Sequence, residues 1–334
     1  TKPNNAFIIP AMSSIPIPAR ANVHPNLRTL NVLRDLPQVA ELIELCFRQN
    51  MDRDGENYVR EMRRASRNQS WMRSMENASN MPLNGYVWEQ DGKIVGNASL
   101  IVFHHNWRKV HLIANVAVHP DHRHRGIARA VTAQVMERAR TGGTQELWLN
   151  VRDDNPDALD LYSDLGFRER ARRTQWQVAE SSIPSTASKE FQIIERPAHF
   201  WPAQRAWLEQ LHPEELAWYR GWNFKGLAPG WWNWRYLLFV DMNLRQWAAL
   251  HNDKLQAVLS WTPNGTRYEP LWLALGPDSA PEAATRLLVH ARSELGKRKF
   301  ILEHPVGPAD ESIRAAGFVL QRTLVWMRAE GATK

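Results

Sequence analysis

The pattern of apolar and polar positions predicts alternating helices and strands in the first half of the 334-residue chain. Apolar residues recur at helical spacing over 36–47 and 126–140, and 52–71 is a more polar helical region. A further helix covers 155–165, opened by an Asn/Asp cap and closed by Gly166. Strands are predicted at 27–32, 85–89, 93–103, 110–118 and 146–151, with a final strand pair in 167–178.

The order of these elements predicts a mixed α/β fold with a mostly antiparallel sheet flanked by helices, because helices and strands do not simply alternate. A run of small and hydroxyl residues near 179–188 has no apolar period and predicts a linker. We therefore divide the chain into an N-terminal extension (1–24), a first domain (25–180), a linker (181–189) and a second domain (190–330).

The second half repeats the pattern of the first. Its turn residues Asn252-Asp253 predict a hairpin, as Asp91-Gly92 does in the first half. The predicted strands cover 246–250, 254–261, 269–275, 300–304 and 319–328, and the predicted helices cover 281–295 and 310–316. The chain thus reads as two copies of one fold.

Composition narrows the class of protein. The net charge is +7, but both halves are only mildly basic and neither has a long basic run, so we expect no nucleic-acid partner. No apolar run approaches the roughly 20 residues of a membrane span, so we expect no stable membrane association and a cytoplasmic location. The single cysteine, Cys46, excludes a disulfide within the chain and a thiolate metal cluster.

Chemistry concentrates between a predicted strand and a predicted helix, in His119-Pro-Asp-His-Arg-His-Arg-Gly-Ile-Ala-Arg-Ala130. Free N–H groups and the positive end of the helix dipole favour an anion there, and Gly126 allows close approach to the backbone. The three histidines, His119, His122 and His124, are spaced by three and two residues. This spacing suits neither face of a helix nor of a strand, so we expect no metal.

Residues Val116-Ala-Val-His-Pro-Asp-His-Arg-His-Arg-Gly-Ile-Ala128 resemble the acyl-CoA signature of the GNAT superfamily of N-acetyltransferases, whose core is Arg/Gln-x-x-Gly-x-Gly/Ala. Downstream, Asn155-Pro-Asp-Ala158, Leu161-Tyr162 and Leu165-Gly166-Phe167 resemble the second half of that family's cofactor site. Two spaced motifs in the expected strand and helix context are more specific than either alone. The resemblance covers 27–178 and implies tandem GNAT-like domains using acetyl-CoA as co-substrate.

The resemblance also implies residue roles. Tyr162 would protonate the departing CoA thiolate as a general acid. Backbone groups of Val116 and Val118 would pair with the pantetheine arm, where the strand bulges and splays from its neighbour. The implied cofactor-binding set is Val116, Ala117, Val118, Arg123, His124, Arg125, Gly126, Ile127, Ala128, Asn155 and Ala158.

Asn115 departs from the family pattern, because many relatives place there a glutamate that acts as base for the attacking amine. An amide cannot take that proton, although an α-amino group of pKa about 8 needs less help than an alkyl amine of pKa about 10. Candidate bases or amine anchors are Asp153, Asp154 and the acidic loop Asp52, Asp54 and Glu56. Such a loop is also typical of a plain solvated turn.

The second copy lacks the chemistry of the first. Aligning Asp121 with Asp278 replaces Arg123, Arg125 and Gly126 by Ala280, Glu282 and Ala283. Aligning Gly166-Phe167 with Gly317-Phe318 replaces Tyr162 by Ile313. We therefore expect a degenerate second domain without acyl transfer.

Most of the 16 tryptophans follow residue 200. They favour a core of large residues, while Trp232 and Trp234 are candidates for a shared acceptor pocket. The sequence thus predicts an acetyl-CoA-dependent N-acetyltransferase acting on a primary amine of a small molecule or peptide, with its active site in the first domain. The alternative is a non-catalytic acyl-CoA sensor.

Overall fold

The computed structural model describes residues 24–48, 51, 53–65, 84–144, 146–179, 190–220, 224–230, 244–263, 268–296 and 298–330. The predicted linker 181–189 lies outside these ranges, as does the predicted N-terminal extension except for His24. Within the described ranges, no helix combines the length and the apolar character needed to cross a bilayer.

The elements of the first half follow the predicted order. The helices are α1 (Val32–Phe47), α2 (Arg53–Ala65), α4 (Ile127–Thr141) and α5 (Pro156–Asp164). The strands are β1 (Leu27–Thr29), β2 (Asn84–Gln90), β3 (Lys93–His105), β4 (Arg108–Val118), β5 (Glu146–Arg152) and β6 (Phe167–Val178). Asp91 and Gly92 both have positive φ angles, 51° and 75°, which confirms the predicted hairpin turn.

The second half repeats this order. Its strands are β7 (Gln192–Glu195), β8 (Arg245–His251), β9 (Lys254–Trp261), β10 (Glu269–Leu275), β11 (Phe300–Pro305) and β12 (Phe318–Ala329). Its helices are α6 (Trp201–Leu211), α7 (Ala217–Arg220), α9 (Pro281–Leu295) and α10 (Ala309–Ala315), with 3-10 turns η3 (Ala198–Phe200), η4 (Glu214–Leu216) and η5 (Phe224–Leu227). Asn252 and Asp253 also have positive φ angles, which confirms the second predicted hairpin.

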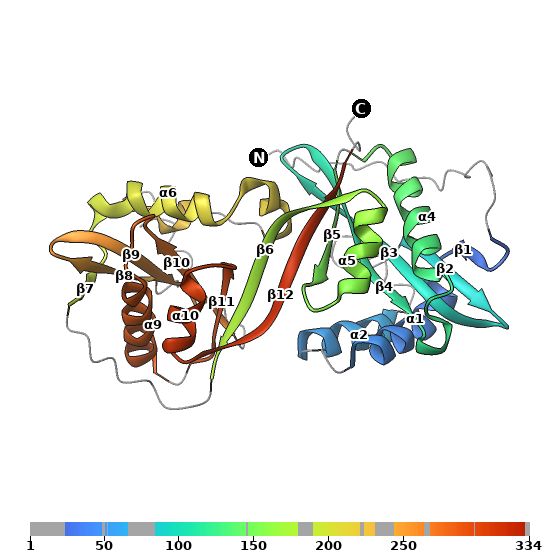
Figure 1. The fold of residues 1–334 in the computed structure, drawn as a ribbon, viewed down its shortest axis with the longest axis horizontal. Coiled ribbons are helices and arrows are strands. Elements are labelled where there is room, and N and C mark those ends of the chain that lie inside the picture. The colour runs from blue at the N-terminus through green and yellow to red at the C-terminus, as the bar shows by residue number, and fades with distance from the viewer. Residues whose placement is uncertain are drawn as a thin grey trace, which may run out of the picture.

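The strands form one 12-stranded sheet in the order β1-β2-β3-β4-β5-β12-β6-β11-β10-β9-β8-β7. The last strand of each half is therefore inserted into the other half, and β6 and β12 lie side by side as the long central ribbons of Figure 1. The predicted strand pair in 167–178 is wrong, because β6 is a single strand whose neighbours are β12 and β11. The strand that pairs with β6 in place of the predicted hairpin partner is β12, from the second half.

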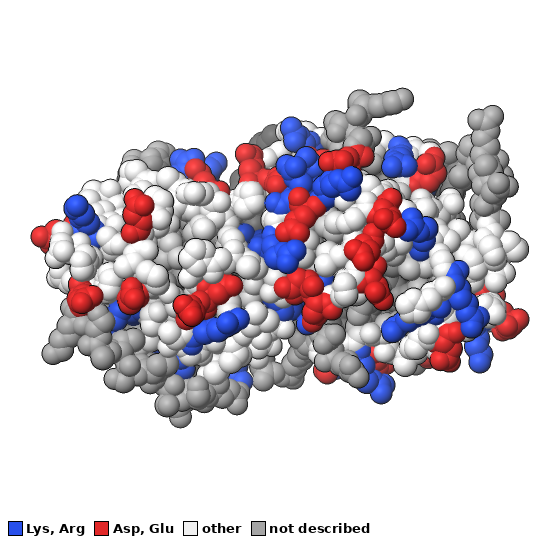
Figure 2. Space-filling model, viewed as in Figure 1, with Lys and Arg blue, Asp and Glu red and all other residues white. Residues whose placement is uncertain are grey.

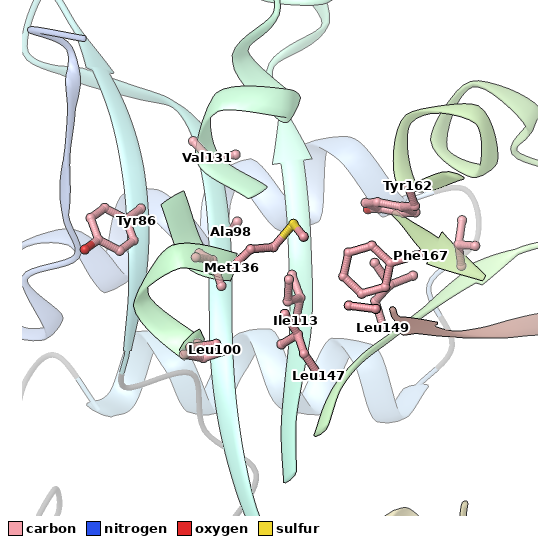
Figure 3. Close-up of a cluster of buried hydrophobic side chains, with 14 of the residues drawn as sticks. Tyr86, Ala98, Leu100, Ile113, Val131, Met136, Leu147, Leu149, Tyr162 and Phe167 are labelled. Atoms are coloured by element: carbon pink, nitrogen blue, oxygen red, sulfur yellow. The ribbon is translucent and has the colours of Figure 1, made fainter. Parts of the chain in front are cut away.

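Helices cover both faces of the first half's sheet. Adjacent residues of a strand point to opposite faces. Tyr86 packs in the core cluster of α4 and α5, and Val87 packs with α1 and α2. Figure 3 shows the first of these cores, with Met136 above the sheet and Tyr162 beside Phe167. This core includes Val325 and Met327 of β12, so the exchanged strand is part of the first half's interior.

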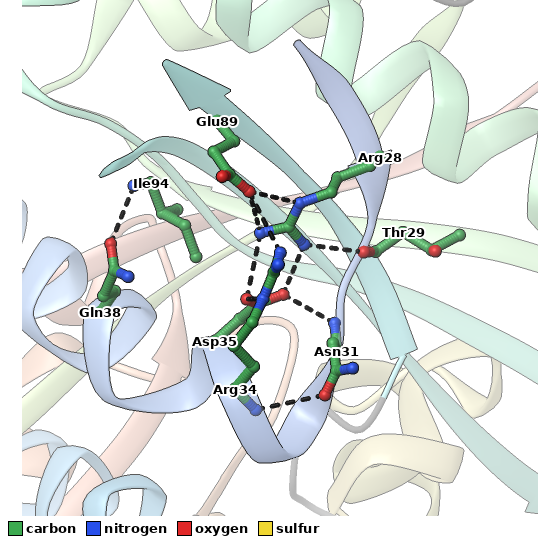
Figure 4. A network of polar contacts seen from close by, with 8 residues as sticks. All are labelled: Arg28, Thr29, Asn31, Arg34, Asp35, Gln38, Glu89 and Ile94. Atoms are coloured by element: carbon green, nitrogen blue, oxygen red, sulfur yellow. Dashed lines mark hydrogen bonds and ion pairs between the residues drawn. The ribbon is translucent and has the colours of Figure 1, made fainter. Parts of the chain in front are cut away.

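A buried ion-pair network attaches the start of α1 to the sheet (Figure 4). The Asp35 carboxylate is 1% exposed and lies 2.6 Å from the Arg28 guanidinium, and it accepts the Asn31 N–H at 2.7 Å. Burial opposes ionisation, but the hydrogen bonds from Arg28, Asn31 and Arg34 hold the pKa of Asp35 below its usual value. The network therefore fixes the first turn of α1 on the sheet.

Lys/Arg and Asp/Glu side chains are interspersed on the face drawn in Figure 2. Over the central strands they form ion pairs, such as Arg170 with Glu215 and Arg172 with Glu169. Arg170 lies on β6 and Glu215 on η4, so one of these pairs joins the two halves.

Candidate functional site

Strands β4 and β5 separate part of the way along their length. They pair in parallel only between Val110–Ile113 and Glu146–Leu149. Further on, β5 continues to pair with β12, where Arg152 lies opposite Leu324, while β4 pairs only with β3 on its other side. Residues 114–118 therefore present a backbone edge towards β5 without a strand partner, which suits an extended ligand.

A bulge lies at the point of separation. Ser99 pairs with Ala114 and Asn97 with Ala117, so Asn115 is displaced from the ladder and takes a positive φ of 54°. The Asn97 side-chain amide donates to the backbone oxygen of Asn115 at 2.8 Å and holds this conformation. The Asn115 side chain in turn donates to the hydroxyl of Tyr58, on α2, at 2.7 Å.

The turn after β4 ends directly at the start of α4. The 3-10 turn η2 (Pro120–His122) and residues 123–126 lead into α4, whose N-cap residue Gly126 has a φ of 77° and no side-chain cap. The N–H of Ala130 is bonded to Gly126 O, which leaves the N–H groups of Ile127, Ala128 and Arg129 directed out of the helix end. A Cβ on Gly126 would meet no atom within 4 Å, so the turn is open to solvent.

The start of α4 is fixed against the sheet by close packing. A Cβ at Gly96 of β3 would lie 2.5 Å from the Ile127 side chain, so only glycine permits this approach. Arg129 forms an ion pair with Asp164 at 2.6 Å and joins α4 to α5. The open helix end is therefore held by a rigid support, as an anion site requires.

The arginines of the turn are placed by local contacts. Arg125 donates to the backbone oxygen of Asp121 at 3.0 Å. Arg123 donates through Nε to Val118 O at 3.4 Å, and the Cys46 thiol also contacts that oxygen, at 3.3 Å. Burial raises the pKa of Cys46, and the neighbouring Arg123 opposes the rise. Arg123 and Arg125 are both exposed residues of the turn that leads to the free N–H groups of α4.

The histidines of the turn do not gather around a common point with other ligating groups. The rings of His119 and His122 are 5.7 Å apart, and Nδ1 of His122 is buried without a hydrogen-bond partner. His119 lies 3.8 Å from Asp121. Among the residues that the structure describes, no group of three His, Cys, Asp or Glu side chains could hold a metal ion.

Tyr162 lies on α5 and faces the sheet. It is 6% exposed, its ring packs against Phe167 at 6.2 Å, and within the described part of the chain its hydroxyl has no hydrogen-bond partner. Burial raises the pKa of the phenol, so it is protonated at neutral pH. The side chain therefore retains a proton that it can donate in the low-dielectric interior.

The acidic and amide residues after β5 have structural partners. Asn155 is the N-cap of α5 and accepts the N–H of Ala158 at 3.2 Å. Asp154 makes two hydrogen bonds with Arg152, at 2.6 and 2.9 Å, which hold the pKa of its carboxyl below the usual value. Asp153 is exposed, with its backbone N–H bonded to Thr323 of β12.

The corresponding turn of the second half differs in both sequence and contacts. The helices α4 and α9 begin at Ile127 and Pro281, so Gly126 corresponds to Ala280 and not to Ala283. The alignment that the sequence suggested is thus wrong by three residues, since 280−126 is 154 and 283−126 is 157. Arg123 and Arg125 now correspond to Pro277 and Ser279, so the cations are again replaced.

The N-terminus of α9 in the second half has fewer free N–H groups than that of α4. Pro281 has no N–H, and the N–H of Ala280 donates to the side chain of Gln256 at 3.3 Å. Strands β10 and β11 still separate after Leu271 and Leu302, as their first-half counterparts do. The fold is therefore repeated, while the open N-terminal end of the helix is not.

Several predicted acceptor residues lie outside the described part of the chain: Asp52, Trp232, Trp234 and the side chain of Asp54. Glu56 is an exposed residue of α2. Two tyrosines near the bulge were not predicted. Tyr58 is four residues beyond Asp54, and Tyr219 comes from the second half. No motif marks either residue, although Tyr58 follows the acidic loop that was suspected on the acceptor side.

Residues 37–167 match the acetyltransferase (GNAT) family. The chain is 35% identical over 80 residues to the [ribosomal protein bS18]-alanine N-acetyltransferase of Escherichia coli K12, covering 24% of this chain and 50% of that protein. It is 34% identical over 77 residues to the streptothricin acetyltransferase of Streptomyces lavendulae, covering 23% of this chain and 40% of the relative. The chain thus spans about half the length of the curated relatives it matches, or less.

The fold likeness extends over both halves. The crystal structure of a GCN5-related N-acetyltransferase from Sphaerobacter thermophilus superposes with a TM-score of 0.52 at 15% identity, covering 94% of this chain and 100% of that one. At this identity the likeness concerns the fold alone. The family match places residues 37–167 in the acetyltransferase (GNAT) family, and the likeness over both halves shows a fold shared with a GCN5-related N-acetyltransferase.

Proposed function

We propose that the first half binds acetyl-CoA and transfers its acetyl group to a primary amine. The observation that carries this proposal is the continuity of two features: the unpaired edge of β4 at 114–118 leads directly into the open N-terminus of α4. An extended amide-containing arm fits the edge, and a pyrophosphate fits the free N–H groups at the helix end.

The residues of this turn fit the charge of the co-substrate. Gly126 lets an anion approach the backbone, and Arg123 and Arg125 add positive charge to the same exposed turn. The second half lacks these features at Pro277, Ser279 and Ala280, which supports placing the active site in the first half. In this proposal, backbone groups of Val116 to Val118 contact the pantetheine arm, and backbone groups of Arg123 to Ala128 contact the pyrophosphate.

In the proposed reaction the amine nitrogen attacks the acetyl carbonyl carbon, the C–N bond forms and the C–S bond breaks. A backbone N–H on the β4 edge stabilises the developing oxyanion. Tyr162 donates its proton to the departing thiolate and is reprotonated from water. The proton of the attacking nitrogen leaves to solvent, because Asn115 cannot accept it and the hydrogen bonds from Arg152 lower the pKa of Asp154 and make it a weak base.

The proposal includes a cytoplasmic location, which the presence of a single cysteine supports, since oxidising compartments favour disulfide pairs. The family match of residues 37–167 favours acetyl-CoA as the co-substrate.

Two measurements on the full chain separate the transferase from an acyl-CoA sensor. Isothermal titration with acetyl-CoA reports binding, and thiol release from acetyl-CoA in the presence of a panel of small amines, aminoglycosides, polyamines and peptides with free N-termini reports transfer. We expect binding in the micromolar range together with release that depends on the amine. Binding without release on any amine would favour the sensor, and absence of binding would reject both.

A further inference from the structure

A short segment of the second half lies on the sheet of the first half. The 3-10 turn η4 and helix α7 place Leu216 and Trp218 in a buried cluster with Ile101, Leu112 and Trp148 of β3, β4 and β5. The ring of Trp218 lies 6.1 Å from that of Trp148. Glu215 forms ion pairs with Arg170 and Arg328, at 3.2 and 3.6 Å. Packing and charge therefore hold this segment in one position.

The segment covers the same face as α1 and α2. Along β4, Leu112 and Ala114 contact the η4–α7 cluster, while Ala117, beyond the bulge, packs with α1 and α2. Ile113, between Leu112 and Ala114, belongs to the core on the opposite face. On this face of β4, residues before the bulge at Asn115 are therefore covered by η4 and α7 of the second half, and residues after it by α1 and α2. We call these two groups of elements the two covers.

Each of the two covers contributes a tyrosine. Tyr58 packs against the α1–α2 cluster and accepts the hydrogen bond from Asn115. Tyr219 packs against the other cluster, with its ring 4.7 Å from Trp326 and 6.1 Å from Phe103. Ala114, the residue before Asn115, packs against the same cluster as Tyr219. Burial raises the pKa of Tyr58, and the Tyr219 phenol adds to this rise.

The polar groups at the bulge are neutral. Among the described residues, no acceptor takes the proton of the Tyr58 hydroxyl, and the side-chain oxygen of Asn115 has no donor. One O–H donor and one amide oxygen therefore remain for a ligand. No carboxylate among the described residues hydrogen-bonds to Asn115 or Tyr58, and Glu146, which accepts from Trp148 in the cluster, is paired with Arg108. A desolvated ammonium without a counter-charge is costly.

We propose that Tyr58 and Tyr219 form the walls of the acceptor pocket around Asn115, so that the second half supplies a specificity-determining residue to the first, and that this pocket takes an α-amino group adjacent to an amide carbonyl. The proposal rests on the proposed function. The Tyr58 hydroxyl donates to the carbonyl oxygen of the acceptor, and the Asn115 oxygen receives an N–H of its amine. At pH 7.5 about a quarter of an α-amino group of pKa about 8 is uncharged, against about 0.3% of an alkylamine of pKa about 10.

The test uses the full-length chain, acetyl-CoA and two probes, L-alanine amide and n-propylamine, at pH 7.5. The wild type should acetylate alanine amide roughly 80-fold faster than propylamine, from the difference in free-base fraction. Tyr219→Ala should raise the KM for alanine amide roughly tenfold and leave the KM for acetyl-CoA within about twofold of wild type. Tyr58→Phe, which keeps the ring, should raise the same KM by roughly three- to tenfold.

Tyr86→Phe is the matched control, because Tyr86 is a buried tyrosine of the opposite face and should change neither KM. Tyr219→Phe keeps the packing and should fall between wild type and Tyr219→Ala. An unchanged alanine amide KM in Tyr219→Ala overturns the proposal, as does an equal rise in both KM values, which would indicate a general effect on the fold. Equal rates for the two amines also overturn it.

The outcome for the wild type separates this proposal from the proposed function. A wild type that binds acetyl-CoA and acetylates another class of amine, but neither probe, overturns the acceptor proposal alone. A wild type that does not bind acetyl-CoA overturns the proposed function, and the acceptor proposal with it.

Discussion

Val325 of β12 is the antiparallel ladder partner of Val151 of β5, although the two residues belong to different halves of the chain. Val325 is fully buried in the core beneath α4 and α5. In the opposite direction, Trp176 of β6 is fully buried in the core of the second half. Each half therefore completes the interior of the other, and the tandem arrangement is a structural requirement of the fold.

Met327→Ala tests this interdependence. Met327 is 3% exposed and lies on β12 within the first half's core, so its truncation should lower the free energy of unfolding by about 2–5 kcal/mol. Val319→Ala on the same strand is the control, since Val319 is 44% exposed and should change stability by under about 0.5 kcal/mol. Urea unfolding monitored by circular dichroism measures both, and equal effects would mean that β12 is not part of that core.

Two buried histidines should make the protein sensitive to mild acid. Burial lowers the pKa of His212 to about 3 and that of His304 to about 4, while an unfolded histidine titrates near about 6.5. At any pH between the folded and the unfolded pKa of these rings, the unfolded chain binds more protons than the folded one. The stability that the neutral rings provide is therefore complete above about pH 6.5 and declines as the pH falls towards 4.

His304→Gln removes one of these two titrating rings. Its slope of unfolding free energy against pH, measured by urea titrations between pH 4.5 and 6.5, should be lower than that of wild type by up to about 1.4 kcal/mol per pH unit. The slope is the relevant quantity, because the substitution also changes packing at every pH. An unchanged slope would show that His304 gains its proton equally easily in both states.

Tyr162→Phe should separate chemistry from binding. The hydroxyl has no partner among the described residues, so its removal should leave the fold and the affinity for acetyl-CoA nearly unchanged. Loss of the general acid should lower kcat by about 100-fold or more. Thiol release and isothermal titration measure the two quantities, and Tyr86→Phe serves as the buried-tyrosine control. A kcat close to that of wild type would assign Tyr162 a packing role only.

The sequence predicted local structure well where a strong local signal exists. The turns at Asp91-Gly92 and Asn252-Asp253 formed as predicted, and Asn155 caps α5. Strand exchange has no such signal: the residues of β6 are typical of a strand, but nothing in them indicates that the partner is β12 and not a neighbouring hairpin strand. The three-residue error at Ala280 arose because an alignment anchored on one aspartate cannot detect a change in loop length.

The acceptor side was the least predictable part of the site. Tyr58 and Tyr219 are far apart in sequence, and Tyr219 lies on the first half's sheet only because η4 and α7 fold onto it. The geometry of the turn before α4 could be predicted because β4, the turn and α4 are consecutive, so that one continuous motif contains the free N–H groups, the glycine and the cations.

The central claim, that the first half and not the second binds acetyl-CoA, is tested most directly by isothermal titration of three proteins. These are wild type, Gly126→Asp and Ala280→Asp, which place the same anion at equivalent helix N-caps. Ala280 has extended N-cap geometry, so aspartate there should stabilise α9 by about 1 kcal/mol and leave binding unchanged. Gly126→Asp should weaken acetyl-CoA binding at least about 100-fold, with its folding checked by circular dichroism. Retained affinity in Gly126→Asp, or lost affinity in Ala280→Asp, would contradict the account.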